Sequence, residues 1–268
     1  MDNTIIFGAY VPGTSPLHRL DPRVKLLICI TYVILVFFAN SWLTCLWSVL
    51  VLLAVIFASQ VSIKMYWRGI RPLAWIILLT VAFQVLFSTG RPVYWHWGFM
   101  SVTQDGLVNS FIIFFRFMVI ITASTVLTAT TPTLRIADAL SWYMQPLKLI
   151  RVPVNQITLM ISIALRFIPT IMDEAVKIAN AQRSRGMNLD EGNIFKRLMR
   201  MVPILIPLFV DSFKRAEELA TAMEARGYDP AAPRTHYRQL SWHRRDTVGL
   251  VLLVVVVLVL FAMRLIIS

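Results

Sequence analysis

Residues 247–267 read TVGLVLLVVVVLVLFAMRLII, an almost unbroken apolar run. A helix needs about 20 apolar residues to cross the hydrocarbon core of a bilayer, and a run that is apolar on every side is typical of a helix surrounded by lipid. The whole chain has the same character, because 57% of its 268 residues are hydrophobic and only 15% are charged. Soluble domains average roughly 45–50% apolar and about 25% charged residues. The sequence therefore predicts a membrane protein, and its abundant apolar residues exclude a disordered chain.

Four further apolar segments precede this run, so the sequence predicts an all-α polytopic membrane protein with about five spans. Together the segments suggest a membrane domain over 1–130, a cytoplasmic domain over 131–246 and a C-terminal transmembrane helix over 247–268. The four spans expected in the membrane domain lie near residues 24–39, 42–58, 72–87 and 106–130.

The basic residues are distributed very unevenly along the chain. Of 26 Lys and Arg residues, 23 lie before or at the start of the first span, between the second and third spans, or in 131–246. Cytoplasmic loops of membrane proteins carry such an excess, so we expect the N-terminus inside and the C-terminus outside. This topology accounts for the net charge of +12, and no nucleic-acid-binding motif accompanies it. We therefore expect the lipid bilayer, and no nucleic acid, as a partner.

The region 131–246 combines short apolar runs with many charges. Apolar runs of about ten to fourteen residues favour buried or interfacial helices over spans. Prolines and glycines divide the region into three expected helices, and the last two, ending at Gly186 and Gly227, are long and amphipathic. Such helices need lipid, each other or a partner protein to cover their apolar faces.

These two long helices end in similar tripeptides, Ser184-Arg185-Gly186 and Ala225-Arg226-Gly227. One interpretation is purely structural: glycine takes the left-handed position after a helix, and arginine in the last turn favours the helix dipole. The other is functional: an exposed guanidinium between small neighbours can enter a groove of another protein and form paired hydrogen bonds there. The repetition of the tripeptide favours the functional interpretation, but both stay open.

At these motifs the chain resembles the transmembrane (T) component of energy-coupling factor transporters, a class of ABC importers for vitamins and metal ions that includes the cobalt-transporter membrane subunit. The family's two motifs are Ala-Arg-Gly or close variants, and Ser184 is a mild departure from them. The resemblance covers most of 130–230, and it rests on Thr130-Thr131-Pro132, on Leu165-Arg166-Phe167-Ile168-Pro169, and on RAEELA at 215–220 leading into AMEARGY at 222–228.

The resemblance implies that the long helices couple two ABC-type ATPase subunits to a substrate-binding membrane protein, the S component, in the cell membrane of a prokaryote. Arg185 and Arg226 would each sit in a groove of one ATPase. ATP and Mg²⁺ would bind to those partners, which agrees with the lack of a GxxxxGK[ST] loop in this chain. We expect no catalytic residue, cofactor site or metal site here, and the chain is expected to be a non-enzymatic subunit.

Arg116 lies about ten residues into the expected fourth span, and an intramembrane charge is a functional candidate by default. An alternative function is therefore a self-contained secondary transporter that uses Arg116. The competing interpretation is a structural arginine that contacts backbone carbonyls, Gln84 or the side of the bundle near Asn109. A third and weaker hypothesis is a membrane enzyme with its site in 131–246, for which no catalytic motif is present.

Overall fold

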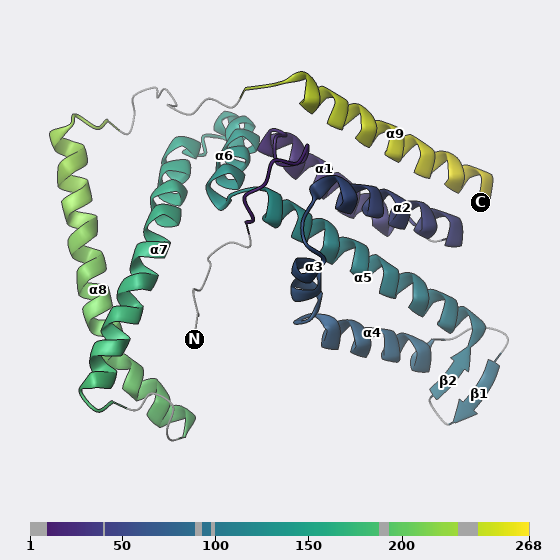
Figure 1. The fold of residues 1–268 in the computed structure, drawn as a ribbon, viewed down its shortest axis with the longest axis horizontal. Helices are drawn as coiled ribbons and strands as arrows, with labels where there is room; N and C mark the ends of the chain where they lie inside the picture. The colour runs from purple at the N-terminus through teal and green to yellow at the C-terminus, as the bar shows by residue number, and fades with distance from the viewer. Residues whose placement is uncertain are drawn as a thin grey trace. The chain divides into compact units, whose positions relative to one another are not determined.

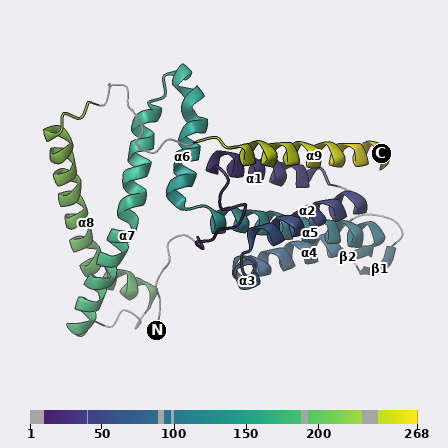
Figure 2. The same cartoon turned by 45° about the horizontal axis from the view of Figure 1, so that its top comes forward.

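The computed structural model describes residues 10–39, 41–88, 93–97, 100–187, 193–229 and 241–267. It divides the chain into two compact units. The first unit comprises residues 1–142 and 240–268, and the second comprises residues 143–239. Figures 1 and 2 show that both units are built mainly of helices.

The first unit is a helical bundle around one long helix, α5, which contacts α1, α2, α3 and α4. The C-terminal helix α9 packs against α1 and α2 (Figures 1 and 2). Its helices are α1 (Pro22–Phe37), α2 (Trp42–Ser59), α3 (Ile63–Ile70), α4 (Ala74–Phe87), α5 (Gln104–Thr130), the start of α6 (Thr133–Met144), and α9 (Arg244–Ile267).

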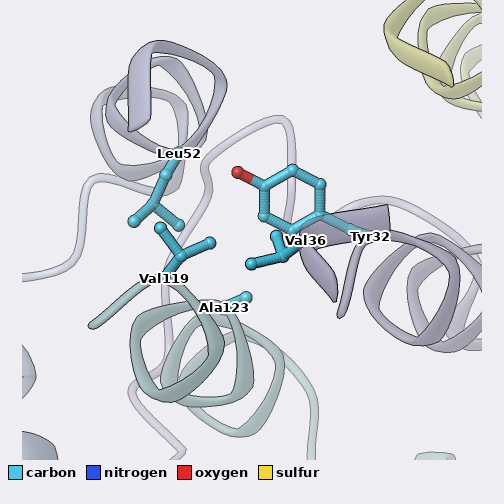
Figure 3. Close-up of a cluster of buried hydrophobic side chains, with 5 residues drawn as sticks. All are labelled: Tyr32, Val36, Leu52, Val119 and Ala123. Carbon is cyan, nitrogen blue, oxygen red and sulfur yellow. The ribbon is translucent and has the colours of Figure 1, made fainter. Parts of the chain in front are cut away.

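The core of this unit joins α1, α2 and α5. In Figure 3, Tyr32 and Val36 of α1 face Leu52 of α2 and Val119 and Ala123 of α5. The Tyr32 hydroxyl donates to the carbonyl oxygen of Ser48, so that the one polar atom of this cluster is paired. Away from the core, most large apolar side chains of the helices are exposed, as expected where lipid covers the bundle.

Local capping signals in the sequence explain where several helices begin. Asp21 accepts a hydrogen bond from Arg23 N at the start of α1, with proline at the first helical position. Ser41 and Thr44 form a reciprocal capping box at the start of α2. These residues satisfy backbone N–H groups that the first helical turn leaves without partners.

A two-stranded antiparallel sheet, β1 (Val93–Trp97) and β2 (Met100–Thr103), lies between α4 and α5. The sequence predicted no strand there. The segment is rich in β-branched and aromatic residues, which favour strands, but its four- and five-residue elements are too short to give a clear alternating pattern. Within the described residues, this hairpin is the departure from an all-helical fold.

The second unit holds the end of α6, the 3₁₀ helix η1 (Gln145–Ile150), α7 (Val154–Ser184) and α8 (Ile194–Ala225). The bounds of α7 and α8 agree closely with the two long helices expected from the sequence. Both helices continue through internal prolines, Pro169 in α7 and Pro203 and Pro207 in α8. The unit begins at Tyr143, whereas the sequence placed the start of the coupling domain at 131.

The fold class expected from the sequence is confirmed: among the described residues, four helices are long and apolar enough to cross a membrane, and α3 with α4, bent by 60°, could form a fifth span. The helices that are long enough to span are not all the ones expected from the sequence. Helix α1 has 16 residues, which rise roughly 24 Å against a hydrocarbon thickness of about 30 Å. Helix α7, which was not expected to span, is long and apolar enough to cross a membrane. The cytoplasmic assignment of 131–246 stays a prediction.

Candidate coupling site

The end of α7 is closed by its own backbone. Gly186 N donates to Arg183 O at 2.9 Å, and Met187 N donates to Gln182 O at 3.1 Å. With Gly186 at a φ of +87°, these two bonds form a Schellman motif, which satisfies terminal helix carbonyls without using a side chain.

The end of α8 repeats this arrangement bond for bond. Gly227 N donates to Glu224 O at 2.9 Å, Tyr228 N donates to Met223 O at 3.0 Å, and the φ of Gly227 is +69°. Apart from the chain neighbours of each glycine, no atom of the described residues lies within 4 Å of the position that a Cβ would take at Gly186 or Gly227. The two glycines are therefore required by backbone conformation and not by close packing.

The side chains of the arginines before these glycines take no part in the helix caps. Arg185 and Arg226 are exposed, and neither side chain makes a hydrogen bond or ion pair within the described parts of the chain. The Ser184 hydroxyl donates back to Asn180 O at 3.2 Å, and Ala225 is exposed and apolar. The structural interpretation of the tripeptides accounts for their glycines, while each guanidinium keeps all of its donors for a partner.

Replacing Gly186 or Gly227 with alanine is expected to cost about 1–2 kcal/mol at each helix end, because an L-residue resists the left-handed conformation. Hydrogen exchange of the last-turn amides, measured by mass spectrometry, should rise locally by roughly tenfold. Gly249→Ala is the matched control, since a Cβ there would meet its neighbours at ordinary distances of 3.6–3.8 Å. Equal exchange in G186A and the unsubstituted protein would contradict the assigned role.

Contacts between α7 and α8 show that the two helices run antiparallel across each other. Gln182 Nε2 donates to Pro203 O at 3.5 Å near the end of α7. Closer to the middle of both helices, Arg215 pairs with Glu174 of α7 and, at 2.9 Å, with Asp211 of its own helix. Figure 1 shows the crossing within the second unit.

The two candidate docking arginines consequently lie at opposite ends of the helix pair. From Pro203, which contacts the end of α7, to Arg226 the chain advances 23 residues, or roughly 35 Å at 1.5 Å per residue. Arg185 follows Gln182 by three residues, next to the Pro203 level of α8. One groove cannot receive both guanidinium groups, so the geometry suits two separate binding surfaces.

Helix α8 also carries an apolar stripe that none of the described residues of the second unit covers. Its members recur at alternating steps of four and three residues, which places them on one helix face, and Phe209 stacks on Phe213 with ring centroids 6.4 Å apart. The stripe consists of the exposed residues Phe195, Met199, Val202, Ile206, Phe209 and Phe213.

Arg116, in the first unit, closes the end of α1. Its Nη2 donates to Phe37 O at 3.4 Å and to Ala39 O at 3.3 Å, and its guanidinium lies 5.4 Å from the centroid of the Phe37 ring. Because α1 is too short to span the bilayer, carbonyls at its end need a partner away from bulk water. The contacts agree with a structural arginine that binds backbone carbonyls.

Replacing Arg116 with methionine should lower stability by about 1–3 kcal/mol, the cost of leaving the carbonyls of Phe37 and Ala39 without a donor away from bulk water. Uptake per folded molecule should stay within about twofold of the unsubstituted protein, and Arg116→Lys should show a smaller loss of stability. SDS-titration unfolding and uptake by reconstituted vesicles provide the two measurements. A variant of unchanged stability that has lost uptake would point to a transport role instead.

A buried polar cluster that the sequence analysis did not identify ties the first unit together. Lys25 Nζ donates to Thr130 O at 3.1 Å and to Thr131 Oγ1 at 3.3 Å. Asp246 accepts from Asp21 N at 2.7 Å. The sequence offered a signal for one member of this cluster, because Asp246 is the third residue of α9, a position where an acidic side chain often caps a helix. Asp21, which donates to Asp246, is distant in sequence.

Comparisons with known proteins identify the family of this chain. A family model described as "Cobalt transport protein" (CbiQ) matches residues 13–237. The energy-coupling factor transporter transmembrane protein EcfT of Limosilactobacillus fermentum is 56% identical over 98% of this chain and 99% of its own length. The EcfT proteins of Lacticaseibacillus paracasei and Lactococcus lactis subsp. cremoris are 51% and 47% identical, over 91% and 96% of this chain and 93% and 96% of their own lengths. The chain therefore belongs to the CbiQ family, together with the transmembrane proteins of energy-coupling factor transporters.

Proposed function

We propose that this chain is the energy-coupling membrane subunit of an ATP-driven importer of a micronutrient, either a vitamin or a metal ion. It transmits the motion of two partner ATPases to a substrate-binding membrane protein and hydrolyses no ATP itself. The observation that carries the proposal is the pair of matched helix ends, each presenting an exposed arginine without a partner in the described chain. ATP and Mg²⁺ bind to the partner subunits.

Each arginine binds one ATPase. A guanidinium offers five donors in a planar fork, which suits a groove lined by carboxylate or carbonyl oxygens, and the small neighbours Ser184 and Ala225 allow close approach. The separation of roughly 35 Å along α8 supports one ATPase at each end. When the two ATPases close on ATP, both helix ends move, and the antiparallel contact between Glu174 and Arg215 passes the motion from one helix to the other.

The apolar stripe of α8 binds the substrate-binding membrane protein. Its six exposed apolar side chains form a continuous face of the helix, and such a face is the usual surface by which an amphipathic helix enters a hydrophobic groove. Sliding or tilting of α8 then alters this contact, which gives the ATPases control over capture and release of the substrate-binding protein.

The alternative function, a self-contained secondary transporter that uses Arg116, has weaker support. The guanidinium already contacts two backbone carbonyls, and the relatives carry the name of an energy-coupling factor transporter component. Residues 24–39, 42–58, 72–87 and 106–130 also contain no Asp or Glu that could relay protons.

The proposal is tested by purifying the tagged full chain after co-expression with the ATPases and the small membrane proteins encoded beside it. We expect two ABC-type ATPases and one small membrane protein in a stoichiometric complex, with ATPase activity and ATP-dependent uptake after reconstitution. Uptake by the chain alone, driven by an ion gradient and indifferent to ATP, would replace the coupling function with the secondary-transporter alternative.

The proposed topology has the N-terminus in the cytoplasm and the C-terminus outside, because nearly all cations lie on one side of the expected spans. A periplasm- or exterior-active reporter such as alkaline phosphatase, fused after Ser268, should be active, while a fusion after Arg234 should be inactive. The measurement is enzyme activity normalised to fusion abundance, with fluorescent-protein fusions at the same positions as the reciprocal control. Activity at both positions would require a different number of spans.

A further inference from the structure

The short helix α3 has a surface that the coupling function does not use. It connects α2 to α4, and it is bent by 60° from α4. Tyr66 fixes its orientation, because this side chain is buried and its hydroxyl lies 2.8 Å from Ser59 Oγ. With Tyr66 directed into the bundle, the opposite side of α3 faces outward.

Two adjacent stripes occupy this outward side. The cations Lys64, Arg68 and Arg71 are spaced by four and three residues, so they follow one line along the helix. Ile63 and Trp67 form the neighbouring line, and they are 81% and 66% exposed. The outer surface of α3 is therefore cationic along one edge and strongly apolar along the other.

Within the described parts of the chain, no acidic side chain pairs with these three cations. No Asp or Glu occurs between Asp21 and Asp105, and none of the three side chains makes a hydrogen bond or ion pair with any residue that the structure describes. Like charges at such spacing destabilise a helix, although the two arginines near its C-terminus gain from the helix dipole. An anion from outside the chain would remove the repulsion.

The neighbouring apolar surface favours lipid over an acidic protein as the source of that anion. The exposed line of α3 leads into α4, whose first turns expose Trp75, Ile76 and Leu78 and which the sequence assigns to a membrane span. Tryptophan beside basic residues at the start of an apolar segment is the pattern of the membrane–water interface. Helices with a cationic edge and an apolar edge lie in that interface.

We propose that α3 is an interfacial helix that binds the headgroups of anionic phospholipids. Lys64, Arg68 and Arg71 contact the phosphates, and Ile63 and Trp67 enter the boundary of the acyl chains. A basic residue near an anionic membrane surface contributes roughly a fivefold preference, so three acting together give a preference for anionic over zwitterionic lipid of up to about a hundredfold. Lipid binding at α3 requires no ATPase partner.

Native mass spectrometry of the purified full chain, titrated with phosphatidylglycerol or phosphatidylcholine, measures this preference. We expect the unsubstituted chain to retain phosphatidylglycerol selectively, and K64Q/R68Q/R71Q to lose most of the selectivity. K64R/R68K/R71K, which keeps the charges, should retain it. R151Q/K177Q/R183Q is the matched control, because it removes one exposed lysine and two exposed arginines from the second unit.

Two results would overturn the proposal. One is an unsubstituted chain that binds both lipids equally. The other is a K64Q/R68Q/R71Q variant that retains phosphatidylglycerol as well as the unsubstituted chain does. If this variant also lost an acidic protein that co-purifies with the unsubstituted chain, the partner of these cations would be a protein and not a lipid. The K64R/R68K/R71K variant separates loss of charge from misfolding, because it changes the same three positions and keeps all three positive charges.

Discussion

The double variant R185A/R226A is expected to lose ATPase binding and ATP-driven uptake by at least a hundredfold while it still inserts into the membrane. Arginines in desolvated pockets are frequent hot spots of interfaces and cost about 2 kcal/mol or more each when truncated. Two such losses exceed a factor of 100 even if they are only partly additive. The measurements are co-purification of the ATPases, ATPase activity of the purified complex and uptake by reconstituted vesicles.

Each cap should survive these substitutions, because the hydrogen bonds that close α7 and α8 come from the backbone of the glycine and the residue after it. A loss of binding would therefore report on the guanidinium and not on unfolding of the helix end. Arg183→Ala is the matched control, since Arg183 is also exposed in the last turn of α7 but precedes the tripeptide. R185K/R226K should recover only part of the binding, because lysine keeps the charge and loses the planar fork.

Normal uptake by R185A/R226A would remove both arginines from the coupling site. A different outcome, loss of binding in R183A to the same extent, would replace a specific contact with a general requirement for positive charge. Single variants add a further distinction. If each arginine binds its own ATPase, R185A and R226A should each yield complexes that lack one ATPase contact, whereas a shared groove would make either single variant as severe as the pair.

The ends of the long helices could be predicted from sequence because their signals are local. Pro153 before α7 and Gly186 and Gly227 after α7 and α8 act within one turn of the helix, and the structure has helices with these bounds. The repetition of arginine before each glycine was likewise visible in the sequence. What the sequence could not give was the antiparallel crossing, which depends on Gln182 meeting Pro203 and on Glu174 meeting Arg215.

Other features escaped prediction because composition does not encode them. Residues 72–87 read as one span, yet the helix begins at Ala74 and follows a separate helix, α3, at 60°. Arg116 was recognised as unusual, but only the fold brings the end of α1 within its reach, 77 residues away for the Ala39 contact. For Arg116 the deciding interaction links segments whose separation along the chain leaves no periodic pattern.

Asp246 is the second position where a single substitution should have a large effect, in this case on stability. Its side chain is 1% exposed, and its two oxygens accept from different elements: Oδ1 from Asp21 N at 2.7 Å and Oδ2 from His243 N at 2.8 Å. The second bond caps α9, and the first ties α9 to the start of α1. Removing the carboxylate leaves the backbone N–H groups of Asp21 and His243 without their acceptor.

Asp246→Ala is therefore expected to lower the free energy of unfolding by about 3–6 kcal/mol, since hydrogen bonds to charged groups contribute roughly 1.5–3 kcal/mol each. Asp246→Asn keeps one acceptor oxygen and should lose about half as much. SDS-titration unfolding of the purified chain measures both values. Asp105→Ala is the control, because Asp105 also lies in the first turn of a helix but is exposed, where the dipole contributes less than about 1 kcal/mol.

The order of the three variants distinguishes a specific junction from a general need for an acidic first turn. If Asp246 acts through its two acceptor bonds, D246N falls between the unsubstituted chain and D246A, and D105A stays close to the unsubstituted chain. If D246A and D105A lost equal stability, helix-dipole electrostatics would account for both, and the bond to Asp21 N would carry no weight. If D246A loses stability and D105A does not, the Asp246 carboxylate is the group that attaches α9 to the start of α1, where its partner Asp21 lies 225 residues away in sequence.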